Sequence, residues 1–141
     1  MRIIGLDLGE KRIGVAAADD RTQIAVPLTA LPAGHDPIAA ITRLLKEQGA
    51  DEAVIGLPLS MSGAVGPQAQ RSIRMVEELG KRLAIPIHTW DERLTTVQAS
   101  RSQLSRQRGG LRSENEKGRR DAIAAAIMLQ AFLDSKRSAG A

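Results

Sequence analysis

An acidic residue inside the first apolar segment of the chain is the first side chain that could do chemistry. Asp7 lies in the run 3–8, whose other residues are apolar or glycine, as is typical of a strand that is buried on both faces. A lone carboxylate in such a place is strongly destabilising unless it is paired or bound to a metal. Asp7 is therefore a candidate ligand, and the alternative is that it only begins the turn at Gly9.

Two adjacent acids follow another apolar segment. Asp91 and Glu92 come directly after residues 85–90, so we expect both at the end of a strand. Asp91 is suited to cap a helix that begins near Leu94. We therefore assign Glu92 as the ligand and Asp91 as the cap or supporting residue, with the reverse assignment as the alternative.

A third acid, Asp121, begins a segment that is apolar on nearly all sides. Gln130 is the single polar residue between Ala122 and Leu133, and a helix with this composition is buried. At about 100° per residue, Gln130 points away from Asp121. Asp121 is thus either a ligand or, in the simpler interpretation, a first-turn acid that favours the helix dipole.

Carboxylates from two strand ends and one helix start can meet only at one edge of a sheet. Asp7, Glu92 and Asp121 would be hard oxygen ligands in a chain that has no cysteine and two histidines, a set that selects Mg²⁺ or Mn²⁺ over zinc. Two such ions about 3.5–4 Å apart clamp the attacking and leaving oxygens of a phosphodiester. The pattern therefore predicts metal-assisted hydrolysis.

Positive charge is concentrated just before Asp121, with seven basic and two acidic residues in the stretch 101–120. We expect phosphate contacts there, and the alternative is a solvated charged loop. The Gly/Pro/Ser-rich loop 58–66 and the turn after Asp7 are further candidates. The residues assigned to nucleic-acid binding are Lys11, Arg12, Ser60, Ser62, Arg93, Arg106, Arg108, Arg112 and Lys117.

Composition limits the class of protein. The chain has 141 residues, a length typical of one domain, and the absence of cysteine excludes a disulfide scaffold and a thiolate site. No apolar run is long enough for a membrane span, and no signal peptide is evident, so we expect a cytoplasmic protein. The net charge of +4 favours a polyanionic partner, although a merely soluble basic protein has the same balance. Aromatic residues are 1% of the chain, so recognition would depend on backbone and shape rather than on stacked bases.

Hydrophobic periodicity predicts a mixed sheet that positions these residues. Three strands with short links form an antiparallel meander, and strands alternating with helices follow, so we expect five strands with helices on both faces in one domain, 1–141. The predicted strands are 2–8, 13–19, 23–31, 53–57 and 85–90. The predicted helices are 37–48, 67–83, 94–106 and 119–134, with an irregular basic stretch over 107–118 and a frayed tail over 135–141.

Several sequence blocks together resemble the YqgF (RuvX) family over nearly the whole chain. They are Gly5-Leu6-Asp7-Leu8-Gly9, Gly14-Val15-Ala16, the block 56–63 (GLPLSMSG), the block 91–96 (DERLTT), and Asp121 followed by Ala124-Ala125. The resemblance implies an RNase H-like fold and a Holliday junction resolvase-like nuclease, and in bacteria also maturation of the 5′ end of pre-16S ribosomal RNA. The implied partners are branched DNA or precursor ribosomal RNA.

The resemblance also implies a metal-binding set of Asp7, an acid in the block 91–93, and Asp121. The family lacks the acid that related resolvases carry at the end of the fourth strand, and here the sequence 56–58 is Gly-Leu-Pro. Glu92 is left as the substitute. Symmetric cutting of two strands of a junction would favour a homodimer.

Two other classes of protein are alternatives. The segment from Asp7-Leu8-Gly9 to Gly14-Val15-Ala16 also looks like the first phosphate loop of actin-like ATPases and sugar kinases. Those proteins enclose a nucleotide between two such domains, whereas this chain has the length of one. A non-catalytic nucleic-acid-binding module is the second alternative, and in such a module the three carboxylates would be dispensable.

Overall fold

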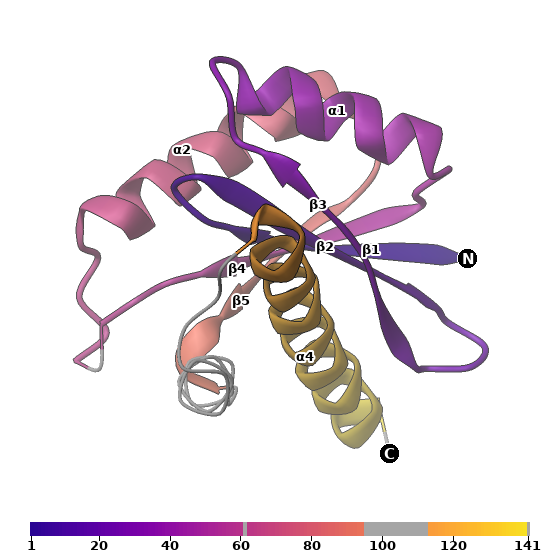
Figure 1. Cartoon of the computed structure of the whole chain (residues 1–141). Helices are drawn as coiled ribbons and strands as arrows, with labels where there is room; N and C mark the ends of the chain where they lie inside the picture. The colour runs from indigo at the N-terminus through magenta and orange to yellow at the C-terminus, as the bar shows by residue number, and fades with distance from the viewer. Residues whose placement is uncertain (61, 95–112, 141) are drawn as a thin grey trace.

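A five-stranded mixed sheet forms the centre of the computed structural model, which describes residues 1–60, 62–94 and 113–140 (Figure 1). The strand order is β3-β2-β1-β4-β5, antiparallel from β3 to β1 and parallel from β1 to β5. The predicted fold class is therefore confirmed. The strands are β1 Arg2–Leu8, β2 Arg12–Asp19, β3 Ala25–Pro32, β4 Glu52–Leu57 and β5 Ile87–Asp91.

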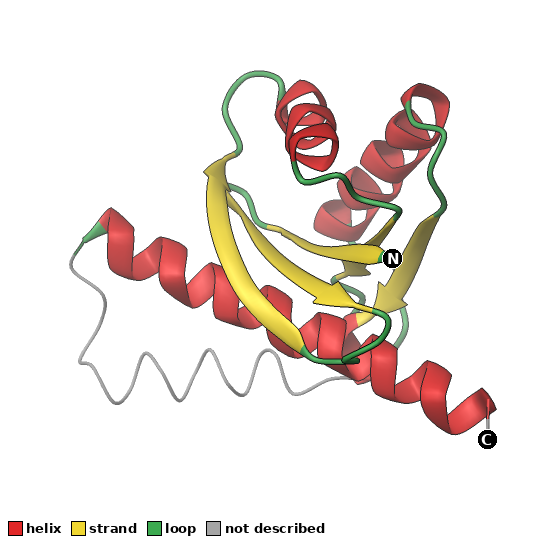
Figure 2. Ribbon diagram, turned by 90° about the vertical axis from the view of Figure 1, so that its right-hand side faces the viewer, coloured by secondary structure: helices red, strands yellow, loops and turns green. Residues whose placement is uncertain are grey.

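Helices cover both faces of the sheet (Figure 2). One face packs against α1 (Pro37–Glu47) and α2 (Pro67–Arg82), and the other packs against the long helix α4 (Glu114–Gly140). A short 3-10 helix, η1 (Glu92–Leu94), follows β5. None of the helices that the structure describes is both long enough and apolar enough to cross a membrane.

The central strand β1 sends alternate side chains to the two helical layers. Ile4 and Leu6 join the core beneath α1 and α2, whereas Ile3 joins the core beneath α4. Gly5 lies under α4 as well, because a Cβ at that position would come within 2.9 Å of Leu129 Cβ. The period of two therefore places Asp7, two residues further on, on the α4 face of the sheet.

The long helix begins earlier than the sequence periodicity predicts. Residues 114–118, expected to be irregular, form its first turns, because Ser113 caps it: the Glu116 amide donates to Ser113 Oγ at 3.1 Å and the Lys117 amide donates to the Ser113 carbonyl at 3.1 Å. Ser followed three residues later by Glu is a capping-box sequence, which the basic composition of the stretch conceals. At its other end α4 continues to Gly140, through the tail that was expected to fray.

Other boundaries differ from the prediction by one or two residues. The third strand begins at Ala25 rather than at residue 23, because Gln23 has a positive φ of 58° and closes a turn onto Asp19. The last strand ends at Asp91, so that acid is the final strand residue. The predicted helix 94–106 lies outside the described residues apart from Leu94, the last residue of η1.

Candidate active site at one corner of the sheet

Asp7 and Asp121 both lie next to Gly14, Asp7 beside it in the sheet and Asp121 over it in α4. Asp7 is 5% exposed and faces Gly14 in the antiparallel register of β1 and β2. A Cβ on Gly14 would overlap the backbone carbonyl of Asp121. The start of the buried part of α4 therefore passes directly over the strand position beside Asp7, and only glycine leaves room for it.

Glu92 reaches the same corner from the end of β5. A Cβ on Gly56 would come within 3.0 Å of both Cγ and Oε1 of Glu92, so this side chain covers the end of β4. Gly56 lies one residue beyond the Leu6–Ile55 pair of the parallel register, as Asp7 does on the neighbouring strand. The Glu92 side chain thus lies against the end of β4, and its role as the substitute for the acid of related resolvases stays a prediction.

The two carboxylates share a shielded environment. Asp7 Oδ2 and Glu92 Oε1 are both inaccessible to solvent. Burial raises the pKa of Glu92 above its ordinary value, and the negative charge of Asp91 raises it further. This corner therefore favours neutralisation of Glu92, by a proton or by a cation.

Asp91 is engaged by its neighbour Arg93. Asp91 Oδ1 accepts from the Arg93 backbone amide at 3.0 Å, and Asp91 Oδ2 accepts from Arg93 Nε at 2.9 Å and from Nη2 at 2.6 Å. These hydrogen bonds hold the pKa of the Asp91 carboxyl below its ordinary value. Asp91 organises the turn after β5, which suits the supporting role predicted for it and leaves the division of roles with Glu92 a prediction.

Arg93 also connects β5 to the loop 58–66. A Cβ on Gly63 would come within 3.1 Å of Arg93 Nη1, and Gly63 has a φ of 86°, which favours glycine. Within that loop Ser60 Oγ lies 3.0 Å from Ser62 Oγ and accepts from the Ala64 amide at 3.1 Å. The two serine hydroxyls therefore stabilise the loop itself in this structure.

Asp121 forms an ion pair that the sequence analysis missed. Arg12 Nε donates to Asp121 Oδ2 at 2.7 Å, and the two side chains are only 18% and 15% exposed. The alternation of β2 gives a partial signal for this pair, since Arg12 points to the same face of β2 as Gly14, the residue that lies under Asp121. Because residues 12 and 121 are far apart in the sequence, only the packing of α4 brings them together.

The three predicted ligands share one face and one corner of the sheet without forming a complete metal site. Within the described ranges, no three carboxylate or histidine side chains are arranged to hold one metal ion. Asp7, Glu92 and Asp121 nevertheless fit a hard divalent cation by donor chemistry, because all are carboxylates and two have an oxygen shielded from solvent. To act as a metal ligand, Asp121 would have to release its hydrogen bond with Arg12 Nε.

The basic residues assigned to nucleic-acid binding fall into three places. Lys11 and Arg12 form the turn into β2, Arg93 follows β5, and Lys117 lies in the first turns of α4. The remaining three, Arg106, Arg108 and Arg112, lie outside the described residues.

Two solved structures that share this architecture are Holliday junction resolvases. The fowlpox virus Holliday junction resolvase matches with a TM-score of 0.58 at 14% identity, over 96% of this chain and 99% of its own. RuvC of T. thermophilus in complex with a Holliday junction substrate matches with a TM-score of 0.56 at 13% identity, over 97% and 96%. At these identities the likeness defines the fold, which is RNase H-like.

The sequence comparisons define the family. The family model described as RuvX, Holliday junction resolvase, matches residues 1–135. A protein of Chloroflexus aggregans named "Putative pre-16S rRNA nuclease" is 46% identical over 96% of this chain and 95% of its own, and one of the same name from Caldanaerobacter subterraneus is 38% identical over 98% and 99%. The chain therefore belongs to the RuvX family of nucleases, which act on phosphodiester bonds, and the predicted resemblance is confirmed.

Proposed function

We propose that this chain is a divalent-metal-dependent nuclease that cleaves structured nucleic acid at the corner formed by Asp7, Glu92 and Asp121. The observation that supports the proposal most directly is the placement of these carboxylates, from β1, the end of β5 and the start of the buried part of α4, on one face and at one end of the sheet. A non-catalytic binding module would have no use for an acid as buried as Asp7.

The ligands in this proposal are Asp7, Glu92 and Asp121, with Mg²⁺ or Mn²⁺ as the ion. Bound divalent metal would supply activation of water and stabilisation of the leaving oxygen. Asp7 is paired with Gly14 on β2 and directly follows Leu6, the last residue of β1 that is paired with β4, so its backbone is held in place before substrate arrives. Glu92 must lose its proton before it can act as a ligand, and the raised pKa delays that loss to higher pH.

The cationic side chains at the corner would position the substrate. Arg93 is held by two hydrogen bonds to Asp91 Oδ2, so its guanidinium is fixed beside the loop 58–66, with its charge partly compensated by Asp91. Arg12 neutralises Asp121 in the structure as it stands. Both residues would place phosphate groups near the carboxylates through charge-assisted hydrogen bonds.

Two substrates fit the proposal: a branched DNA such as a four-way junction, and the 5′ region of precursor 16S ribosomal RNA. The description of the family supports the first, and the name of the sequence relatives supports the second. A homodimer would suit symmetric cutting of a junction.

The test is cleavage of a labelled four-way junction and of labelled precursor ribosomal RNA, each with Mg²⁺, with Mn²⁺ and with excess chelator. We expect metal-dependent cleavage of one or both substrates, and loss of that cleavage in Asp7→Asn. Glu78→Gln, an exposed acid on α2, is the matched control and should cleave at the parent rate. Undiminished cleavage by Asp7→Asn, or in chelator, would contradict the proposed site.

A further inference from the structure

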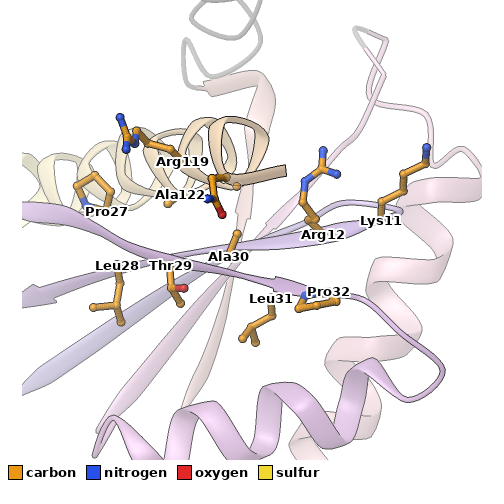
Figure 3. A pocket seen from close by; sticks show the side chains of 12 residues that line it. Lys11, Arg12, Pro27, Leu28, Thr29, Ala30, Leu31, Pro32, Arg119 and Ala122 are labelled. Carbon is orange, nitrogen blue, oxygen red and sulfur yellow. The ribbon is translucent and has the colours of Figure 1, made fainter. Parts of the chain in front are cut away.

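A cavity of about 630 Å³ lies beside the candidate active site, at the open edge of the sheet (Figure 3). Its walls are the turn into β2, the edge strand β3 over residues 27–32, and the first turns of α4. Three of its lining residues, Lys11, Arg12 and Arg119, are basic, and none of the described residues that line it is acidic. We call this cavity the basic pocket.

The walls of the basic pocket are held in place by backbone contacts. The Gly9 amide donates to the Arg12 carbonyl at 3.0 Å, and the Ala33 amide donates to the Lys11 carbonyl at 2.9 Å. On the opposite wall, a Cβ on Gly118 would come within 3.4 Å of Ala30 Cβ, so α4 and β3 are in close contact there. The backbone that carries these charges is therefore preformed, which lowers the entropic cost of binding.

The chemistry of the lining points to phosphate rather than to a base. Besides the three cations, the lining consists of aliphatic and small polar residues and includes no aromatic ring among the described residues. Bases bind single-strand proteins by stacking on aromatic rings, whereas backbone phosphates bind Lys and Arg. In Figure 3, Lys11, Arg12 and Arg119 project to the same side of β3, and Leu28 and Leu31 project to the other.

The basic pocket is continuous with the candidate active site through one side chain. Arg12 lines the pocket, and its Nε donates to Asp121 Oδ2 at 2.7 Å. A phosphodiester backbone that lies in the pocket would therefore continue toward the carboxylates. Sequence analysis gave Lys11 and Arg12 together as candidates in the turn after Asp7, and included Arg119 only within the basic stretch 101–120. The structure places the three residues in the lining of one cavity.

We propose that the basic pocket binds the phosphate backbone of the nucleic acid next to the bond that is cut, with Lys11 and Arg119 as phosphate contacts that do not read sequence. This inference rests on the proposed function, because it supposes a nucleic-acid substrate. It adds a binding site on the edge strand and the start of α4 to the carboxylate corner.

Binding can be measured apart from cleavage in an Asp7→Asn background. The probe is a labelled four-way junction, titrated by fluorescence anisotropy at several salt concentrations. The test variant is Lys11→Gln with Arg119→Gln. The matched control is Lys81→Gln with Arg82→Gln, which removes the same charges from exposed positions on α2, across the sheet from α4.

We expect weaker binding to junctions of every sequence and a slope of log affinity against log salt that is lower by about 2 units in the test variant, since each duplex phosphate contact contributes about 0.9. The control should keep the parent slope. Lys11→Arg with Arg119→Lys should restore the slope, because the charges return. An equal slope in the test and control variants would overturn the proposal.

Two further outcomes separate this inference from the proposed function. If the salt slope falls in the test variant but the parent protein with Asp7 intact cleaves neither substrate with either metal, the basic pocket is a phosphate-binding site and the nuclease proposal is wrong. If a single nucleotide competes as strongly as the junction for the parent protein but not for the test variant, the cavity is a nucleotide site and the backbone proposal is wrong.

Discussion

Arg12 and Asp121 hold opposite charges in contact where both side chains are largely shielded from water. Removing Arg12 would leave the Asp121 carboxylate in a partly buried position without its 2.7 Å hydrogen bond. We expect Arg12→Gln to lower the free energy of unfolding by about 1–3 kcal/mol, the range for a buried charged group that loses its partner. Urea unfolding in metal-free buffer measures this change.

A matched ion pair on the surface provides the control for that measurement. Arg137 Nη2 lies 2.8 Å from Asp134 Oδ1 near the end of α4, but the two side chains are 63% and 51% exposed. Arg137→Gln should change the free energy of unfolding by less than about 1 kcal/mol, because solvent screens such pairs. Equal effects of Arg12→Gln and Arg137→Gln would mean that the pair at the corner is not shielded.

Glu92 gives the protein a pH dependence with a defined sign. Burial raises the pKa of Glu92 in the folded protein above its ordinary value of 4.5, so the folded state holds the proton more tightly than the unfolded chain does. Its contribution to stability is fully present below about pH 4.5 and is lost as the pH rises through the raised pKa. Glu92→Gln should therefore unfold at higher urea concentration than the parent above that window, and the difference should shrink at lower pH.

The same titration affects the proposed reaction in the opposite direction. A protonated Glu92 is a poor metal ligand, so cleavage should rise with pH through the raised pKa while stability falls. Parent protein and Glu78→Gln should show the same pH profile for cleavage. A profile that is flat across this window would argue that Glu92 is not a ligand.

At the scale of single residues, sequence reasoning found the acids but not their partners. Asp7 and Glu92 were predicted from acids placed at the ends of apolar segments, and both lie at the corner of the sheet. The contact of Arg12 with Asp121 was missed because it depends on how α4 crosses β2. The pairing of Asp91 with Arg93 was missed because two residues of a turn can bond in many ways.

Glycines decide how closely the secondary-structure elements approach one another. Gly14 lies under the backbone of Asp121, and an added Cβ would overlap a carbonyl that cannot move without displacing α4. We expect Gly14→Ala to lower the free energy of unfolding by about 3 kcal/mol or more, the upper end of the range for overpacking. Thermal or urea unfolding would measure it, and cleavage should fall with it because Asp121 shifts.

Gly80 provides the opposite case in the same protein. It lies in α2, and a Cβ there would meet nothing within 4 Å. Gly80→Ala should therefore raise the free energy of unfolding by about 0.5–1 kcal/mol through helix propensity. If Gly14→Ala and Gly80→Ala shift stability in the same direction, the close approach of α4 to β2 is not as the structure places it.

At the scale of elements, periodicity was sufficient where one pattern dominated. The strands and helices from Arg2 to Asp91 were predicted to within two residues, because alternating and helical patterns are separated by Gly, Pro and Asp signals. The start of α4 was misplaced because charged residues hide the apolar period, and the cap at Ser113 was the signal that would have located it. The change from antiparallel to parallel strands was predicted from short links and alternation with helices, whereas the order β3-β2-β1-β4-β5 comes from the structure.

Across the whole molecule, positive charge is distributed unevenly around a modest net charge of +4. The basic pocket and Lys117 lie at the end of the sheet that also carries the candidate active site. The face of the sheet opposite α4 is covered by α1 and α2, whose exposed cations are interspersed with acids such as Glu77 and Glu78. Binding should therefore depend on where the charges are and not only on their sum.

Three arginines outside the described residues test this dependence. Replacing Arg106, Arg108 and Arg112 together with Ala should weaken binding to all nucleic-acid sequences alike, because phosphate contacts position without reading bases. The slope of log affinity against log salt should fall by about 2–3 units if all three make contact. The matched control replaces Arg71, Arg74 and Arg82, three exposed arginines on α2, with Ala. Both triple variants lose the same net charge, so equal slopes in the two would mean that overall charge alone attracts the substrate. A lower slope only in the variant of Arg106, Arg108 and Arg112 would place part of the phosphate-binding surface in the segment before α4.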